Sequence, residues 1–301
     1  MVINYIVMCL IFGTTFLAIK IGIEDGMPPF WFATLRFFIA GALILAFLGW
    51  RKQLKRLSFR MYAEIAFVGI LMTTIPYASL FWAEQHIASG LAALLVATAP
   101  IFNTIIGIVA GQMQFRWNLF VGLVLGIIGT SFVVGIGQGV AHDDPLALES
   151  KLSIVAAEFF CAIGAIRSKK VMNHVSPFAF NGLQMIFSSC GLFVLSICLE
   201  DIATVTYNLS SVSALLYLSV IASILALGIY YWLLKETNPT FPSTWTYVAP
   251  VIAMIVGAIF LDEKLTTLHV IGGCCVLAGI VILNWRTWGE IRFKKYQKTM
   301  N

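Results

Sequence analysis

Residues 29–50 read Pro-Phe-Trp-Phe-Ala-Thr-Leu-Arg-Phe-Phe-Ile-Ala-Gly-Ala-Leu-Ile-Leu-Ala-Phe-Leu-Gly-Trp, and Arg36 is the only charged side chain among these 22 residues. A helix rises about 1.5 Å per residue, so about 20 apolar residues cross the hydrocarbon core of a bilayer. The run is followed by Arg51-Lys52, and basic residues typically mark the cytoplasmic end of such a helix. We therefore predict a membrane-spanning helix whose C-terminal end faces the cytoplasm.

The composition of the whole chain agrees with a membrane protein. Hydrophobic residues make up 60% of the 301 residues and charged residues 11%, whereas soluble domains carry about 25% charged residues. So much apolar surface cannot be hidden inside a soluble protein of this length, so lipid must surround it. The cysteines lie in apolar runs without metal-ligand spacing, which predicts packing roles and no metal site: they are Cys9, Cys161, Cys190, Cys198, Cys274 and Cys275.

Apolar segments of spanning length follow one another along the chain, separated by turn-forming residues such as Pro28-Pro29 and Asn238-Pro239. We predict an all-α integral membrane protein with ten transmembrane helices. No loop between them is long enough to house a soluble domain. The predicted segments are 2–23, 29–50, 61–83, 89–111, 117–138, 152–171, 177–199, 212–234, 241–261 and 267–287.

The basic residues give these helices a direction. With the N-terminus inside, 15 of the 19 Lys and Arg residues fall on the cytoplasmic side, and only Lys20, Arg36, Lys151 and Lys264 do not. Positive charge collects on the cytoplasmic side of membrane proteins, so we predict a multi-pass plasma-membrane protein with both termini cytoplasmic. This distribution also explains the net charge of +5 without a nucleic-acid partner. Acidic pairs fall on the other side: Glu24-Asp25, Asp143-Asp144, Glu200-Asp201 and Asp262-Glu263.

The two halves of the chain resemble each other at a fixed offset. Matches of Gly, Pro and Trp weigh most, because leucine matches occur between any two membrane helices. We predict a first five-helix repeat at residues 1–140, a second at 150–287 and a basic cytoplasmic tail at 288–301. At an offset of 150, Trp82 meets Trp232, Ala99-Pro100 meets Ala249-Pro250, Gly107 meets Gly257, Gly122 meets Gly272 and Gly129 meets Gly279; at 148, Pro29-Phe30 meets Pro177-Phe178 and Phe32 meets Phe180.

The second repeat must be inverted, because five spans leave the chain on the opposite side of the membrane. The loop Arg51–Arg56 is strongly basic, whereas its counterpart in the second half contains Glu200-Asp201 and no basic residue. Inverted repeats are a recurrent plan of secondary transporters, in which the two repeats exchange conformations around a midplane site. The architecture therefore favours solute transport, with a scaffold or a channel as the alternative.

Several short motifs resemble the EamA-type family of the drug/metabolite transporter superfamily. Phe12-Gly-Thr-Thr-Phe-Leu-Ala-Ile-Lys20 resembles that family's Trp-Gly-Ser-x-Phe-x-x-x-Lys first helix. Further resemblance lies in Pro28-Pro29, Leu35-Arg36-Phe37, Ser89-Gly-Leu-Ala-Ala-Leu-Leu95, Ala99-Pro100, Ala249-Pro250 and Asp262-Glu263-Lys264. The resemblance implies a ten-helix exporter or exchanger of amino acids, other metabolites or drugs. It also implies a central cavity lined by the first four helices of each repeat, with the fifth helices as support.

A charged residue at the centre of a membrane-spanning helix costs about 2.5–3.5 kcal/mol. Arg36 therefore needs an interaction that offsets this cost. It lies about two turns inside its span, with Lys20 and Glu84 nearer the same outer face. An Arg36–Glu84 or Lys20–Glu84 ion pair would offset part of the cost and hold the first three helices together. The alternative is a substrate site, because a guanidinium binds a carboxylate in bidentate fashion.

Glu158 is the only acidic residue well inside the sixth predicted span. Burial without a cation favours the protonated carboxyl, which makes Glu158 a candidate proton carrier. The alternative is a carboxyl that stays neutral and hydrogen-bonds a backbone carbonyl.

Aromatic and proline residues complete the candidates. Trp82 and Trp232 lie at helix ends, where interfacial aromatic belts explain them, whereas Tyr77, Tyr230 and Tyr247 are candidates for substrate binding. Pro100 and Pro250 remove helical hydrogen bonds and are candidate hinges. The Gly107–Gly111 and Gly122–Gly126 pairs predict close helix packing, with homodimerisation as the second interpretation.

The predicted function is gradient-driven export of a small amphipathic metabolite, such as an amino acid, by alternating access. A proton or solute gradient would supply the energy, since no nucleotide-binding motif is present in the sequence. The expected partners are a small-molecule substrate and the lipid bilayer, without a cofactor. A lipid-modifying enzyme would need catalytic groups clustered at one depth, and the sequence offers no such cluster. A scaffold or sensor subunit and an uptake carrier remain as alternatives.

Overall fold

A computed structural model of the chain describes residues 1–54, 56–87, 89–134, 145–202, 205, 207–260 and 267–300. Within these ranges the regular structure is helical, and no strand is formed. The acidic pairs predicted at Asp143-Asp144 and Asp262-Glu263, and Lys264, lie outside the described residues. The first half contains α1 (Val2–Gly13), α2 (Thr15–Glu24), α3 (Pro29–Trp50), α4 (Phe59–Gly69), η1 (Ile70–Thr74), α5 (Ile75–Ala83), α6 (Ser89–Val96), α7 (Ala99–Val109) and α8 (Trp117–Val134).

The second half has a similar order of helices. It contains α9 (Ala147–Val171), α10 (Pro177–Leu199), α11 (Leu209–Leu216), η3 (Tyr217–Ala226), α12 (Leu227–Glu236), α13 (Thr240–Ser243), α14 (Trp245–Phe260) and α15 (Thr267–Met300). Helix α15 runs into the segment predicted as a tail, which is therefore helical through residue 300.

Local sequence explains where the helices begin and end. Pro29 opens α3 and Pro177 opens α10, because proline lacks the N–H that a first-turn residue would leave unpaired. The hydroxyl of Ser176 accepts a hydrogen bond from the backbone of Ala179 and so caps α10. Gly26 follows α2 with a φ of 90°, a conformation that favours glycine.

The predicted segments overlap helices or short runs of helices. Among the described residues, six runs are long and apolar enough to cross a membrane. This finding does not cover all ten predicted spans or their division into two repeats, so the ten-span, two-repeat arrangement stays a prediction. The six runs are Val2–Glu24, Pro29–Trp50, Phe59–Ala83, Leu91–Val109, Pro177–Leu199 and Leu209–Glu236.

Two of these runs contain π-helical turns, η1 and η3. Moved back by the repeat offset of 150, the range of η3 becomes 67–76, which contains the range of η1. A π-helical turn widens the helix and often marks a functional position. Both halves therefore carry the same irregularity at the same place in their third predicted span.

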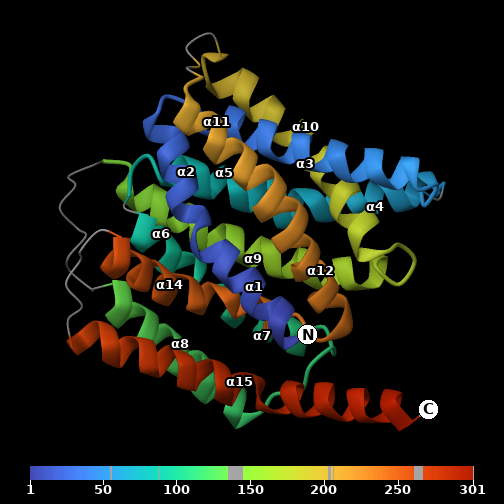
Figure 1. Cartoon of the computed structure of the whole chain (residues 1–301), viewed down its shortest axis with the longest axis vertical. Coiled ribbons are helices and arrows are strands. Elements are labelled where there is room, and N and C mark those ends of the chain that lie inside the picture. The colour runs from blue at the N-terminus through green and yellow to red at the C-terminus, as the bar shows by residue number, and fades with distance from the viewer. Residues whose placement is uncertain are drawn as a thin grey trace.

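Two helix pairs lie at opposite edges of the bundle (Figure 1): α3 packs against α10, and α8 packs against α15. Small residues allow the second pair to come close. A Cβ atom on Gly122 would lie 2.8 Å from the carbonyl oxygen of Gly279, and one on Gly129 would lie 2.7 Å from that of Gly272. A Cβ on Gly126 would lie 2.5 Å from the Tyr247 ring. The Gly122–Gly126 face thus packs within the chain, and homodimerisation stays a prediction.

Candidate functional site

The remaining helices surround a central cavity of about 80 Å³. Its wall comes from the first, third and fourth predicted spans of each half. The residues lining it are Phe12, Thr15, Phe16, Ile19, Met72, Pro76, Tyr77, Leu80, Val96, Ala99, Asn103, Ile154, Glu158, Cys161, Leu227, Tyr230, Tyr231, Ser243, Trp245 and Thr246.

The composition of this wall corrects one expectation. The family resemblance implied that the first four helices of each repeat line the cavity, but the described lining contains no residue of α3 or α10. These two helices pack on each other instead, and a Cβ on Gly41 of α3 would lie 3.0 Å from the carbonyl oxygen of Gly182 of α10. The fifth helices, α8 and α15, also lie outside the described lining.

Glu158 is the only charged residue among the described residues of the cavity wall. Its side chain projects from α9 and is 7% exposed. Cys161 lies almost one turn further along the same helix and also lines the cavity. Within the described part of the chain, no hydrogen bond or ion pair engages the Glu158 carboxyl. Its predicted role as a proton carrier is not tested by this position.

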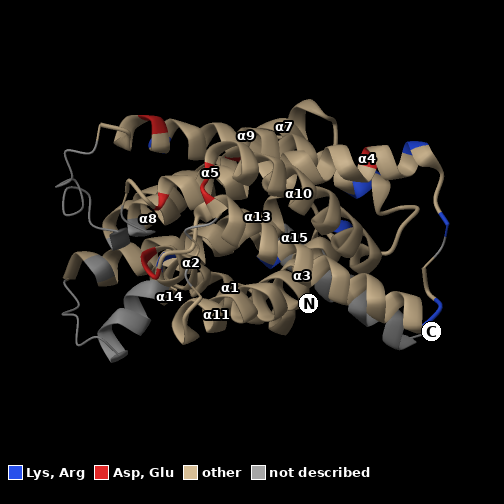
Figure 2. Ribbon diagram, turned by 90° about the horizontal axis from the view of Figure 1, so that it is seen from above, with Lys and Arg blue, Asp and Glu red and all other residues tan. Residues whose placement is uncertain are grey.

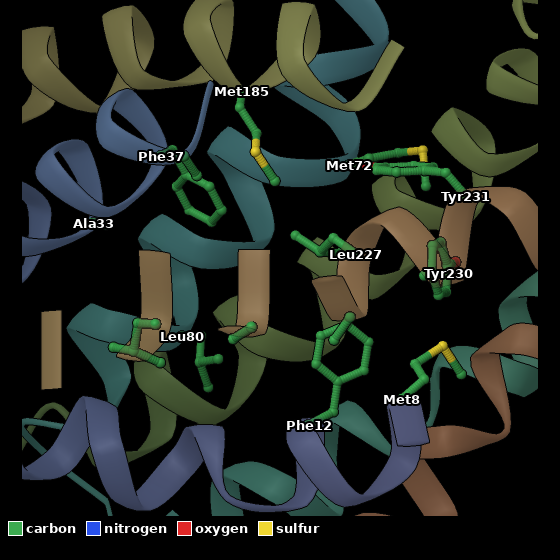
Figure 3. Packing of buried hydrophobic residues seen from close by; sticks show 14 of the residues in the cluster. Met8, Phe12, Ala33, Phe37, Met72, Leu80, Met185, Leu227, Tyr230 and Tyr231 are labelled. Atoms are coloured by element: carbon green, nitrogen blue, oxygen red, sulfur yellow. The ribbon is translucent and has the colours of Figure 1, made fainter. Parts of the chain in front are cut away.

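Aromatic side chains form much of the remaining wall. Tyr77 and Tyr230, both predicted from the sequence, line the cavity. Phe12 and Trp245 pack with their ring centres 4.4 Å apart on another side of it. Figure 3 shows Phe12 of α1 and Tyr230 of α12 directed into the space between their helices. Neither Phe12 nor Trp245 is among the predicted substrate-binding residues, although Phe12 belongs to the first-helix motif.

Asn103 is a polar lining residue that the sequence did not single out. It is 1% exposed, and its side-chain amide nitrogen donates a hydrogen bond of 2.9 Å to the carbonyl oxygen of Ala99. Its Oδ1 is buried and accepts no hydrogen bond. A single asparagine in an apolar span is a weak sequence signal, and its place beside α9 emerges only from the packing of α7 against α9.

Tyr247 lies away from the cavity. Its side chain is fully buried in a cluster with Val251 and Val276, and its hydroxyl has no hydrogen-bond partner. Successive helical residues are rotated by about 100°. Because Trp245 and Thr246 face the cavity, the next residue is turned toward α8.

Arg36 is fully buried on α3 and is not part of the described lining. Its Nε donates a hydrogen bond of 2.9 Å to the hydroxyl oxygen of Ser223. The guanidinium carbon lies 4.8 Å from the ring centre of Tyr77 and 4.9 Å from that of Phe37. The two terminal nitrogens have no hydrogen-bond partner. Arg36 therefore meets the cavity wall at the Tyr77 ring.

The predicted ion pairs of Glu84 are wrong. Lys20 Nζ donates a hydrogen bond of 3.0 Å to the backbone oxygen of Glu84, not to its carboxylate, and forms its ion pair with Glu24 at 3.6 Å. Both carboxylate oxygens of Glu84 are buried without a hydrogen-bond partner. The reason is position: Glu84 directly follows α5, where a lysine satisfies a terminal carbonyl oxygen, and Glu24 lies one turn from Lys20 on the same helix.

The two candidate hinges have different settings. Pro100 is the second residue of α7. A short turn interrupts the helix between α6 and α7, so Pro100 lies in the first turn of a new helix. Pro250 lies inside α14 and interrupts its hydrogen bonding. The hinge role of both prolines stays a prediction.

Long apolar helices around a cavity with a single acidic side chain in its described wall are typical of a multi-pass membrane transporter. A sequence model of the EamA-like transporter family matches residues 1–135 and again residues 150–285. The chain therefore belongs to the EamA-like transporter family, and it is a multi-pass membrane protein.

Curated relatives cover nearly the whole chain. It is 27% identical to the "Uncharacterized inner membrane transporter YedA" of Escherichia coli over 275 residues, covering 91% of this chain and 87% of the relative. It is 25% identical to the "Uncharacterized transporter YoaV" of Bacillus subtilis over 271 residues, with coverage of 90% and 92%. It is 26% identical to a "Probable amino-acid metabolite efflux pump" of Escherichia coli over 289 residues, with coverage of 92% and 93%.

A protein of known crystal structure shares the fold, with a TM-score of 0.77 and 17% sequence identity over 93% of this chain and 94% of that one. At this level of identity the similarity concerns the fold alone.

Proposed function

We propose that this protein is a secondary transporter that exports a small amphipathic metabolite across the plasma membrane by alternating access. The observation that carries this proposal is the central cavity, whose wall draws on corresponding spans of the two halves. A site between two related halves can open to either side when the halves exchange conformations. A proton or solute gradient would supply the energy.

Contacts inside the bundle support two inverted five-helix repeats. The rings of Phe32 and Phe81 meet edge to face with centres 5.6 Å apart. Their counterparts at offsets of 148 and 150 are Phe180 and Tyr231, whose rings meet in the same way at 5.0 Å. Both contacts join the second and third predicted spans of one half. The same edge-to-face contact therefore occurs at corresponding positions of the two halves, as expected for a duplicated unit.

The glycine crossing of α8 and α15 supports the same arrangement. Gly122 faces Gly279, and Gly129 faces Gly272. Because Gly122 and Gly272 are repeat counterparts, as are Gly129 and Gly279, exchanging the two halves converts the first contact into the second. An approximate two-fold axis between the halves has this property.

The charge distribution supports an orientation with both termini in the cytoplasm. Figure 2 shows most Lys and Arg segments near the start of α4 and toward the C-terminal end of the molecule. Most acidic segments lie toward the opposite end. Such a separation along the helix direction matches the rule that positive loops stay in the cytoplasm.

The direct test is flux through the purified full-length chain in proteoliposomes. We expect vesicles that contain the protein to exchange an internal radiolabelled metabolite for external unlabelled metabolite, and a pH gradient to accelerate its movement. Protein-free vesicles and vesicles with heat-inactivated protein are the controls. Folded protein that moves none of a broad panel of amino acids, amines and sugars would contradict the proposal and favour a scaffold or sensor role.

A further inference from the structure

We propose that the cavity selects a protonated organic amine, whose ammonium group pairs with Glu158, over the corresponding amino acid. This inference rests on the proposed transport function and adds a substrate class to it. The ligand would carry one positive charge and an apolar, preferably aromatic, body.

The first argument is the charge of the wall. Glu158 is the only charged residue among the described lining residues, and no Lys, Arg or His is among them. Lys20 pairs with Glu24 and donates to the Glu84 carbonyl oxygen. Arg36 lies outside the described wall, behind the Tyr77 ring, although its two terminal nitrogens have no hydrogen-bond partner. A substrate carboxylate would therefore lose its hydration without gaining a cation in the described wall, which is strongly unfavourable.

The second argument is the pattern of hydrogen-bonding groups. An ammonium group offers three donors and no acceptor. The wall presents two acceptors that no described residue engages: the carboxyl of Glu158 and the buried Oδ1 of Asn103. These residues lie on α9 and α7, which pack against each other.

The third argument is the aromatic surface of the same cavity. Phe12, Tyr230 and Trp245 line the same cavity, with the first and last packed at 4.4 Å between ring centres. Aromatic ring faces attract cations, most strongly when water is excluded. The same rings also provide apolar surface for the body of an amine.

Glu158 can hold a proton or an ammonium group, but not both. Exchange of one protonated amine for one proton would move no net charge across the membrane.

The titratable neighbours that share this cavity with Glu158 are a phenol on α5, two phenols on α12 and a thiol on α9 itself, all uncharged at neutral pH. They are Tyr77, Tyr230, Tyr231 and Cys161. Helix α4 contributes Glu64, which pairs with Arg167 at 2.8 Å outside the cavity wall. Within the described wall, α6, α7 and η1 add no ionisable group.

Cys161 provides a native reporter for this site. It lies on the cavity wall, whereas Cys190 is exposed outside it. We would treat the purified full chain with N-ethylmaleimide and quantify alkylation of each cysteine by peptide mass spectrometry. The probes are phenethylamine and phenylalanine, which share a body and differ in the carboxylate. Tryptamine and tryptophan form a second pair.

We expect each amine to slow alkylation of Cys161 at a concentration about tenfold or more below that needed for its amino acid. Alkylation of Cys190 should not change. Acidic buffer should weaken the protection by amines, because the proton competes for Glu158. Equal or better protection by the amino acids would overturn the proposal without any variant being made.

Variants sharpen the test. Glu158→Gln should abolish protection by amines, whereas Glu149→Gln, an exposed position on the same helix, should preserve it. If Glu158→Gln does not fold, Glu158→Asp should fold. In that variant amines should still protect Cys161 from alkylation, but with weaker affinity. Amine protection that persists in folded Glu158→Gln contradicts the proposal. Flux of a neutral or anionic solute without any amine protection would refute amine selection and leave the transport function intact.

Discussion

Arg36 on α3 donates a hydrogen bond of 2.9 Å to the hydroxyl oxygen of Ser223 on η3. The repeat offsets of 148 and 150 relate these residues to Gln184 and Thr73, and the Thr73 hydroxyl donates a bond of 2.7 Å to Oε1 of Gln184. All four residues are fully buried. Each bond joins the second predicted span of one half to the third of the other, next to or within a π-helical turn. At the predicted repeat offsets the two junctions correspond in position but differ in chemistry, because one contains a guanidinium and the other an amide.

Arg36→Gln copies the side chain of its counterpart. We expect the variant to fold and to keep amine transport within about threefold, because glutamine can still bond Ser223. Arg36→Ala should lower the free energy of unfolding by about 1–3 kcal/mol, since it leaves the Ser223 hydroxyl unpaired in the core. Thermal unfolding in detergent and flux in proteoliposomes measure the two effects. Loss of substrate binding in a stable Arg36→Gln protein would instead support a carboxylate site.

Glu158→Gln should abolish amine export driven by the proton gradient, because the variant lacks the carboxylate that would bind both the proton and the ammonium group. In wild-type protein, acidifying the external side should accelerate amine export, because external protons would displace the amine from Glu158. The variant should lose this acceleration, whereas Glu149→Gln should retain it. Flux from inside-loaded vesicles with and without an imposed pH gradient is the measurement. An unchanged response to the gradient would exclude Glu158 as the proton carrier.

Phe12→Ala tests the aromatic wall. Loss of one cation–aromatic contact of about 1 kcal/mol should raise the KM for phenethylamine about fivefold. Tyr247→Phe is the matched control, because its buried hydroxyl has no partner and lies away from the cavity. It should leave the KM unchanged and should not lower the melting temperature. A large effect of Tyr247→Phe on the KM would place this residue in the substrate path.

Gly122→Leu tests the crossing of α8 and α15. Even a Cβ atom would lie 2.6 Å from Cβ of Leu283 and 2.8 Å from the backbone of Gly279. We expect loss of folded protein, with a cost of about 1–3 kcal/mol or more from overpacking. Gly49→Ala is the control, since its added Cβ would meet only Leu54 at 3.6 Å. Size-exclusion chromatography in detergent and melting temperature report both outcomes; normal stability of Gly122→Leu would contradict this packing.

The positions of the helices could be predicted because spanning length and apolar composition are local properties. The internal offset stays a prediction that rests on glycine, proline and tryptophan matches, because leucine matches between membrane helices carry little information. The partner of Arg36 could not be predicted, because Ser223 lies 187 positions away and no periodicity relates the two helices. The proposed ion pairs of Glu84 failed for a different reason: Lys20 reaches the backbone oxygen of Glu84 but forms its ion pair with Glu24, one turn away on its own helix.

The candidate site could be predicted in part. Glu158 is conspicuous as a lone carboxyl in an apolar span, and Tyr77 and Tyr230 as deep aromatic residues. Trp245 and Tyr247 show the limit: they are two positions apart on α14, yet one lines the cavity and the other packs toward α8. The sequence alone does not fix the rotation of a helix that is apolar on all sides.

Alternating exposure of the cavity is most directly measured at Cys161. A membrane-impermeant maleimide would be added to right-side-out and to inside-out vesicles that contain the wild-type chain, with peptide mass spectrometry as the readout. We expect Cys161 to be alkylated from one side at a time, and phenethylamine or a reversed pH gradient to shift the reactive side. Alkylation from one fixed side under all these conditions would contradict alternating access around Glu158.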